Sequence, residues 1–205
     1  MKRGVRMKVL ILGGFLGSGK TTALYSLARY IVEQSASDSE YKVMILENEI
    51  GKNSIDDKFL QAGGLKVNTL FQGCACCSVS GELIGSINQI KEICDPDWII
   101  LETTGIAYPK KIQENLKDYM NIDSRIVVLV DAVRWRRILI PMNNLLSGQI
   151  IGSDAVLINK VDLSTEEALL QVEADIRAFD ENPPIFRIAA INGVDDAVWK
   201  EVLGQ

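Results

Sequence analysis

Short apolar runs alternate with longer segments of helical periodicity along the chain. The runs are rich in β-branched residues and span 7–14, 42–48, 65–70, 97–102, 125–132, 154–160 and 184–190. Most are almost continuously apolar, which is typical of strands buried on both faces. Helical spacing occupies 20–34, 80–94, 109–119, 133–149, 164–180 and 193–203. This alternation predicts an α/β fold, a mostly parallel sheet of about seven strands flanked by helices.

Two local features refine this picture. Ser164 precedes a helical segment and Glu167 follows three residues later, which is the capping-box pattern of a helix start. The segment 49–66 fits neither period and is long for a connection, as functional or mobile loops often are. Because no repeat or linker interrupts the pattern, we expect a single domain over residues 1–205.

Composition and charge narrow the class of protein. The chain has 205 residues, of which 47% are apolar and 24% charged, as in folded globular domains. Its formal net charge of −5 argues against nonspecific binding to nucleic acid or to an anionic membrane. The basic N-terminus and the apolar run at 9–17 lead into a glycine-rich motif without a cleavage site, and no apolar stretch approaches the ~18 residues of a membrane span. We therefore expect a cytoplasmic protein.

A phosphate-binding loop is predicted at "GGFLGSGKTT" (13–22), between an apolar run and a helical segment. Glycines allow the backbone N–H groups of such a loop to turn inward, and the helix start adds positive potential for phosphate. Lys20 is expected to contact the β- and γ-phosphates in catalysis, and Thr21 to hold Mg²⁺. The alternative is a β–α turn without a ligand. The candidate nucleotide-binding residues here are Gly14, Gly17, Ser18, Gly19, Lys20, Thr21 and Thr22.

A carboxylate for Mg²⁺ is predicted at the end of the run "WIILETTG" (98–105), whose spacing matches the D-x-x-G element of GTP switches with Glu in place of Asp. Glu102 would orient a water on Mg²⁺ and act in catalysis, and the Gly105 N–H would detect the γ-phosphate. An acid at a strand end is otherwise a helix cap or a solvated group. Asp131 ends another run and is interpreted by default as a solvated or strand-end group, with a polar role near the nucleotide as the alternative.

The identity of the nucleotide base is predicted from "NKVD" at 159–162, directly after an apolar run. Asp162 would accept two hydrogen bonds from guanine that adenine does not offer in that position. Asn159 would support the loop and the base edge, while the stem of Lys160 would cover the base face. In order after the other two motifs, this tetrapeptide favours GTP over ATP.

The chain has four cysteines and no histidine, and three of the cysteines lie together as Cys74, Cys76 and Cys77. A tight loop would turn these thiols toward one point, which suits Zn²⁺, Co²⁺ or another transition metal. Without histidine, Glu47 and Glu49 are the remaining candidate ligands. Two alternatives stay open: the thiols pack in the interior, or Cys74 and Cys77 form a C-x-x-C redox pair. Cys94 is interpreted as an ordinary buried cysteine.

These motifs resemble, in content and order, the CobW-like metallochaperone GTPases, which are related to the urease and hydrogenase metal-insertion GTPases. The matching segments are "GGFLGSGKTT", "ENEIG" (47–51), "GCACC" (73–77), "ETTG" (102–105) and "NKVD". The resemblance implies a SIMIBI-type P-loop NTPase and a GTP-dependent metallochaperone or metal-insertion factor. Relatives serve zinc homeostasis, cobalamin synthesis and nitrile hydratase maturation. The family's metal-binding cysteines correspond to Cys74, Cys76 and Cys77.

The sequence departs from the family pattern in several places. Many members carry a C-terminal domain and a histidine-rich stretch, neither of which we expect here. Lys52 stands where many relatives have an acid, and Gln72 stands where Asn is usual. Both differences adjoin the segments that correspond to the family's metal site, and neither lies in a nucleotide motif.

The hypothesis from the sequence is a switch in which GTP and Mg²⁺ order the loop 49–66 and so change the ligands of a thiolate-bound metal. Hydrolysis to GDP would release the ion to a client metalloprotein or cobalamin-related protein. Intrinsic turnover should be slow, with Glu49 as a candidate for orienting the attacking water. The resemblance also implies a homodimer that depends on bound nucleotide, because members of the family dimerise in this way. The alternatives are a regulatory GTP-binding module with a fixed structural metal, acting on a partner such as a corrinoid enzyme, and an ATP-using redox factor.

Overall fold

The sheet of the molecule is continuous and parallel. A computed structural model of the chain describes residues 7–35, 43–47, 65–68, 79–93 and 95–205. Seven strands lie in the order β3-β2-β4-β1-β5-β6-β7, and every neighbouring pair is parallel. The strands are β1 (Lys8–Gly14), β2 (Val43–Glu47), β3 (Leu65–Asn68), β4 (Trp98–Glu102), β5 (Ser124–Asp131), β6 (Ala155–Asn159) and β7 (Ile185–Ile188). Each lies within its predicted run, except that β5 begins one residue earlier.

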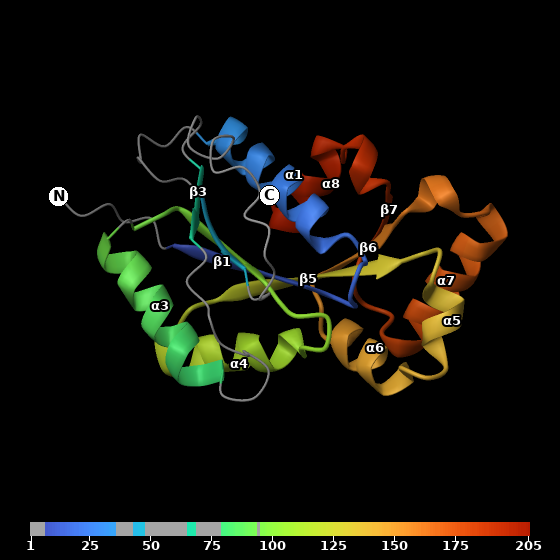
Figure 1. Cartoon of the computed structure of the whole chain (residues 1–205), viewed down its shortest axis with the longest axis horizontal. Helices are drawn as coiled ribbons and strands as arrows, with labels where there is room; N and C mark the ends of the chain where they lie inside the picture. The colour runs from blue at the N-terminus through green and yellow to red at the C-terminus, as the bar shows by residue number, and fades with distance from the viewer. Residues whose placement is uncertain (1–6, 36–42, 48–64, 69–78, 94) are drawn as a thin grey trace.

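Helices cover both faces of this sheet (Figure 1). The helices are α1 (Lys20–Gln34), α3 (Val79–Ile93), α4 (Pro109–Met120), α5 (Trp135–Leu139), α6 (Asn143–Ile150), α7 (Glu166–Phe179) and α8 (Asp196–Leu203). Helices α1 and α8 pack on one face, and the other helices pack on the opposite face. The predicted α/β class with a parallel sheet is therefore confirmed.

Alternate residues of the central strand supply the two cores. Val9 and Ile11 of β1 belong to the core under α3, α4, α6 and α7, whereas Leu10 and Leu12 belong to the core under α1. All four side chains are buried. Since both faces exclude water, the strand needs apolar residues at consecutive positions, and this explains the continuous runs of the sequence.

The predicted helix over 133–149 is wrong in one respect, because the structure divides it into α5 and α6. Pro141 lies between them. A proline has no N–H to donate, and its ring clashes with the carbonyl four residues earlier, so α5 ends before it. Met142 then precedes α6, which begins at Asn143.

Two predicted helix starts are also shifted. The Thr165 hydroxyl, not that of Ser164, accepts the bond from the Ala168 N–H at 3.3 Å. Ser164 instead donates to the Lys160 carbonyl, and because the N-cap is Thr165, the capping box predicted to begin at Ser164 is wrong. Helix α8 begins at Asp196, after the expected Gly193, because Asp195 caps it through the N–H of Ala197 at 2.8 Å.

In the part of the chain that the structure describes, no helix combines the length and the apolarity that a membrane crossing requires.

Helix α8 is joined to the core by Trp199, which is 1% exposed and donates its indole N–H to Ser26 Oγ at 3.3 Å. We expect Trp199→Ala to lower the free energy of unfolding by about 3–5 kcal/mol, because it leaves a large cavity between α8 and α1. Trp199→Phe, which keeps most of the volume, should cost only about 1 kcal/mol. Urea denaturation of both variants measures this, and a loss below 1 kcal/mol for Trp199→Ala would show that α8 contributes little to the core.

Candidate functional site

The motif residues gather where the strands end. Parallel pairing brings the carboxyl ends of neighbouring strands to one edge of the sheet (Figure 1). Gly14 ends β1, Glu102 ends β4 on one side of it, and Asp131 and Asn159 end β5 and β6 on the other. The loop from Gly14 to α1 therefore lies between Glu102 on one side and Asp131 and Asn159 on the other.

The loop conformation requires glycine at its two ends. Gly14 has φ 134° and Gly19 has φ 95°. A Cβ at Gly14 would lie 2.3 Å from the carbonyl oxygen of Leu129, and one at Gly19 would lie 2.2 Å from Nδ2 of Asn159. Neither space admits a side chain, so the tight turn and the close approach of β5 and β6 depend on these two residues.

Lys20 and Ser18 lie inside the loop. The Lys20 side chain is 4% exposed, and its Nζ donates to the carbonyls of Gly14 at 3.0 Å and Phe15 at 3.4 Å. The Ser18 hydroxyl is buried without a hydrogen-bond partner among the described residues. A buried cation and an unsatisfied hydroxyl at a helix start are the chemistry that a bound phosphate needs.

The first turn of α1 is joined to the end of β4. Thr21 Oγ1 donates to Glu102 Oε1 at 3.0 Å, and Glu102 is 5% exposed. A hydroxyl and a carboxylate are hard oxygen ligands of the kind that Mg²⁺ prefers. These two residues therefore fit the predicted magnesium site, whereas the side chain of Thr22 is exposed.

Gly105 packs directly against the loop. It is buried, and a Cβ there would lie 2.5 Å from the backbone nitrogen of Leu16. Gln149 of α6, also buried, donates through Nε2 to the carbonyls of Gly105 at 3.1 Å and Ala107 at 3.0 Å. Sequence reasoning missed Gln149, although an amide among the apolar residues of a predicted helix is a signal of a specific hydrogen bond.

On the other side, Asn159 connects three segments. Its Nδ2 donates to the Ser18 carbonyl at 2.8 Å, and its Oδ1 accepts from the Ala190 N–H at 2.9 Å. Lys160 adopts a left-handed conformation with φ 67° and donates from Nζ to the Gly17 carbonyl at 2.9 Å. Asp162 follows in a short 3₁₀ turn and is exposed. The predicted contacts of these side chains with a base stay predictions.

Asp131 ends β5, as one half of its default interpretation expects, but it is buried, so the other half, a solvated group, is wrong. It is 2% exposed, and its Oδ2 accepts from Arg134 Nε and Lys160 Nζ, each at 2.6 Å. Its Oδ1 accepts from the N–H groups of Val133 and Arg134. Burial alone would raise the pKa of Asp131, but the hydrogen bonds from Lys160 and Arg134 outweigh it and hold the pKa below its ordinary value.

The predicted transition-metal site cannot be placed. Cys74, Cys76, Cys77 and Glu49 lie outside the described residues, as does Cys94. The backbone of Glu47 ends β2 opposite Glu102 of β4. Where the structure is described, no three His, Cys, Asp or Glu side chains form a cluster that could hold a metal ion.

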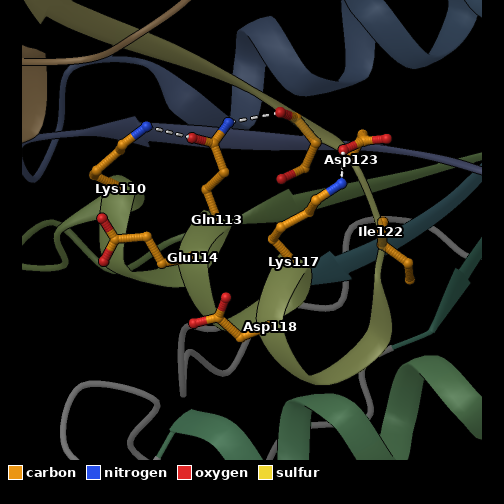
Figure 2. Close-up of a pocket in the computed structure, with 8 residues that line it drawn as sticks. Lys110, Gln113, Glu114, Lys117, Asp118, Ile122 and Asp123 are labelled. Atoms are coloured by element: carbon orange, nitrogen blue, oxygen red, sulfur yellow. Dashed lines mark hydrogen bonds and ion pairs between the residues drawn. The ribbon is translucent and has the colours of Figure 1, made fainter.

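A groove of about 330 Å³ lies along α4 and the start of β5, away from the glycine-rich loop (Figure 2). Its basic groups already have neighbours: Lys110 donates to Gln113 and Lys117 pairs with Asp123 at 2.6 Å. Gln113 donates in turn to the Ser124 carbonyl. Because both lysines already have partners, the groove offers little to an anionic ligand.

The charge of Asp131 should support folding above the ordinary aspartate pKa of about 3.9. We expect Asp131→Ala to lower the free energy of unfolding by about 2 kcal/mol at pH 7, since it removes the hydrogen-bond acceptor that Arg134 and Lys160 share. Because the folded-state pKa is lowered, this contribution is present above the unfolded pKa and is lost as the pH falls through the folded pKa.

Urea unfolding between pH 7 and pH 3 measures the effect. Asp131→Asn is the control, because it keeps an oxygen for the Val133 and Arg134 N–H groups while removing the charge. The difference in the free energy of unfolding between wild type and either variant should become smaller below pH ~4. A difference that stays constant with pH would show that the charge of Asp131 is not what stabilises the fold.

Comparison with known proteins places the chain in a family. The model of the CobW/HypB/UreG nucleotide-binding domain matches residues 8–187. The zinc chaperone YjiA of Escherichia coli K12 is 32% identical over 170 residues, which cover 77% of this chain and 50% of that protein. The zinc-regulated GTPase metalloprotein activator 1 of Schizosaccharomyces pombe is 33% identical over 181 residues, 82% of this chain and 42% of that one. The chain thus spans about half the length of these curated relatives.

Solved structures agree in fold. Zn(II)-bound YjiA GTPase from E. coli superposes with a TM-score of 0.66 at 22% identity, covering 97% of this chain and 62% of that one. HypB from Helicobacter pylori in complex with nickel superposes with a TM-score of 0.62 at 21% identity, covering 95% of this chain and 83% of that one. The resemblance seen in the sequence motifs is confirmed, and the chain belongs to the CobW/HypB/UreG family of nucleotide-binding domains.

Proposed function

We propose that the chain binds GTP with Mg²⁺, hydrolyses it to GDP and phosphate, and uses this cycle to control a thiolate-bound metal ion destined for a client metalloprotein. The observation that carries the nucleotide part is the 3.0 Å bond from Thr21 to Glu102 beside the buried Lys20. It brings a hydroxyl and a carboxylate together at the mouth of a glycine-rich loop. The family membership supports the same assignment.

In this proposal the chain acts mainly by positioning the phosphates. Lys20, which bonds to loop carbonyls, turns its ammonium to the β- and γ-phosphates and offsets their charge. Thr21 and Glu102 hold Mg²⁺, which when bound neutralises charge that develops on the phosphate oxygens. Gly105, held by Gln149, offers its N–H toward the γ-phosphate. Glu49 remains the candidate for orienting the attacking water, and intrinsic turnover is slow.

Guanine is selected by the segment after β6. Asp162 is exposed and free to accept from the ring N–H and the exocyclic amine of the base. Asn159 joins that segment to the phosphate loop and to the Ala190 N–H. The base contacts and the phosphate contacts are therefore made by segments that touch each other.

The metal is cargo held by Cys74, Cys76 and Cys77, with Glu47 as a further ligand. Support comes from the sheet, where the Glu47 backbone lies opposite Glu102 on the adjacent strand. Glu102, the proposed magnesium ligand, thus lies on the strand next to Glu47, the proposed further ligand of the thiolate-bound metal. The names of the relatives, zinc chaperones and a zinc-regulated metalloprotein activator, favour Zn²⁺ over Co²⁺ or another transition metal. We further propose a single domain acting in the cytoplasm as a nucleotide-dependent homodimer.

The base assignment is tested by Asp162→Asn. We expect about 100-fold weaker GDP binding, because the amide oxygen keeps at most one of the two hydrogen bonds, without the charge, and the amide NH2 meets a second donor of guanine. Affinity for xanthosine diphosphate should increase, because xanthine presents a carbonyl in place of the exocyclic amine. Calorimetric titration measures both nucleotides. Asp196→Asn, an exposed acid on α8, is the control and should leave both affinities unchanged. If Asp162→Asn retains its preference for GDP, then Asp162 does not read the base.

The metal cycle is tested by titrating reduced protein with Zn²⁺, Co²⁺ and Cu(I) in the nucleotide-free, GDP and nonhydrolysable-GTP states. We expect metal affinity to change by about tenfold between the two nucleotide states, and nucleotide affinity to change by the same factor when metal is bound. Replacing Cys74, Cys76 and Cys77 by serine should abolish metal binding and leave GDP binding intact. Equal metal affinity in all three states would instead support the regulatory module with a fixed structural metal.

A further inference from the structure

The backbone carbonyls of the glycine-rich loop are held by side chains. Five consecutive carbonyls each accept a hydrogen bond from a side chain, and the four donors come from three different segments. Gly14 and Phe15 accept from Lys20, Leu16 from Arg134, Gly17 from Lys160 and Ser18 from Asn159. Lys20, Lys160 and Asn159 belong to the recognised motifs. Arg134 belongs to none of them.

Bonding a carbonyl fixes the direction of the next N–H. In a trans peptide the C=O and the N–H point to opposite sides of the chain. When Arg134 holds the Leu16 carbonyl outward, the N–H of Gly17 is turned toward the inside of the loop. The Ser18 N–H is already engaged, because it closes a turn on the Phe15 carbonyl at 3.1 Å. The direction of the Gly17 N–H therefore depends on Arg134.

Arg134 is itself held in place by the buried carboxylate. Its Nε donates to Asp131 Oδ2 at 2.6 Å while its Nη2 donates to Leu16. A Cβ at Gly17 would lie 2.9 Å from that Nη2, so the guanidinium packs on the loop backbone. The planar fork of arginine bonds the carboxylate through one nitrogen and the carbonyl through another, whereas a lysine at position 134 would have to reach both from a single nitrogen, as Lys160 does with Asp131 and Gly17.

We propose that Arg134 is a positioning residue for the β-phosphate of the bound nucleotide. It acts through the loop: Asp131 holds the guanidinium, the guanidinium holds the Leu16 carbonyl, and the Gly17 N–H is thereby presented to the phosphate. The inference rests on the proposed binding of a guanine nucleotide at this loop. The side chain is 37% exposed, so it can be replaced without opening a cavity in the core.

The test compares nucleotides with and without a β-phosphate. We expect Arg134→Gln to weaken GDP binding about tenfold in the presence of Mg²⁺, the effect of losing one charge-assisted hydrogen bond. Binding of GMP, which has no β-phosphate, should be unchanged. Arg136→Gln is the matched control, because it removes the same charge two positions later from an exposed side chain. It should change GDP affinity less than about twofold.

Each outcome is decisive. If wild type binds GDP and Arg134→Gln binds it equally well, the inference falls and the proposed function stands. If GDP and GMP weaken together, Arg134 has a general structural role and the inference also falls. If wild type binds no GDP, both fall.

If Arg134→Gln does not fold, Arg134→Lys carries the test. It keeps the charge but not the fork, so we expect about threefold weaker GDP binding with GMP unchanged. Unchanged GDP affinity in that variant would overturn the inference.

Discussion

The buried carboxylate of Asp131 is the interaction on which the arrangement of the loop depends. A carboxylate removed from water is costly unless charged and polar partners converge on it. Here the partners are Arg134, at the start of α5, and Lys160, directly after β6. Both cations also donate hydrogen bonds to carbonyls of the loop after β1. One negative charge therefore fixes the relative positions of three segments that are distant in sequence.

The opposite side of the loop is built differently. There the contacts are the bond from Thr21 to Glu102 and the packing of Gly105 against Leu16, supported by Gln149. The Thr21 hydroxyl donates to the Glu102 carboxylate, so this bond is charge-assisted through its acceptor, whereas Asp131 accepts from two cations. The segment after Glu102 is bonded by the neutral amide of Gln149, which donates to the carbonyls of Gly105 and Ala107. Neutral hydrogen bonds are weaker than charge-assisted ones, so these contacts are rearranged more easily than those around Asp131, which suits a segment proposed to respond to the γ-phosphate.

The strands, and the position of the motif residues at one edge of the sheet, could be predicted because each depends on a local pattern. Buried parallel strands need continuous apolar runs, and parallel pairing brings residues such as Glu102 and Asn159 to one edge whatever their separation in sequence. The split of α5 from α6 could also have been predicted, because Pro141 is a visible signal. The choice of Thr165 over Ser164 as the helix cap could not, since it depends on the Lys160 carbonyl that Ser164 binds.

Arg134 and Gln149 were missed for a different reason. Arg134 lies 118 positions from Leu16, and Gln149 lies 44 positions from Gly105. Neither contact follows from a motif, because a hydrogen bond to a carbonyl places no demand on the partner's residue type. Such side chains act on the backbone of the recognised motif instead of on a ligand. The family pattern therefore identifies the groups proposed to touch the nucleotide, while the groups that orient them become visible only in the folded chain.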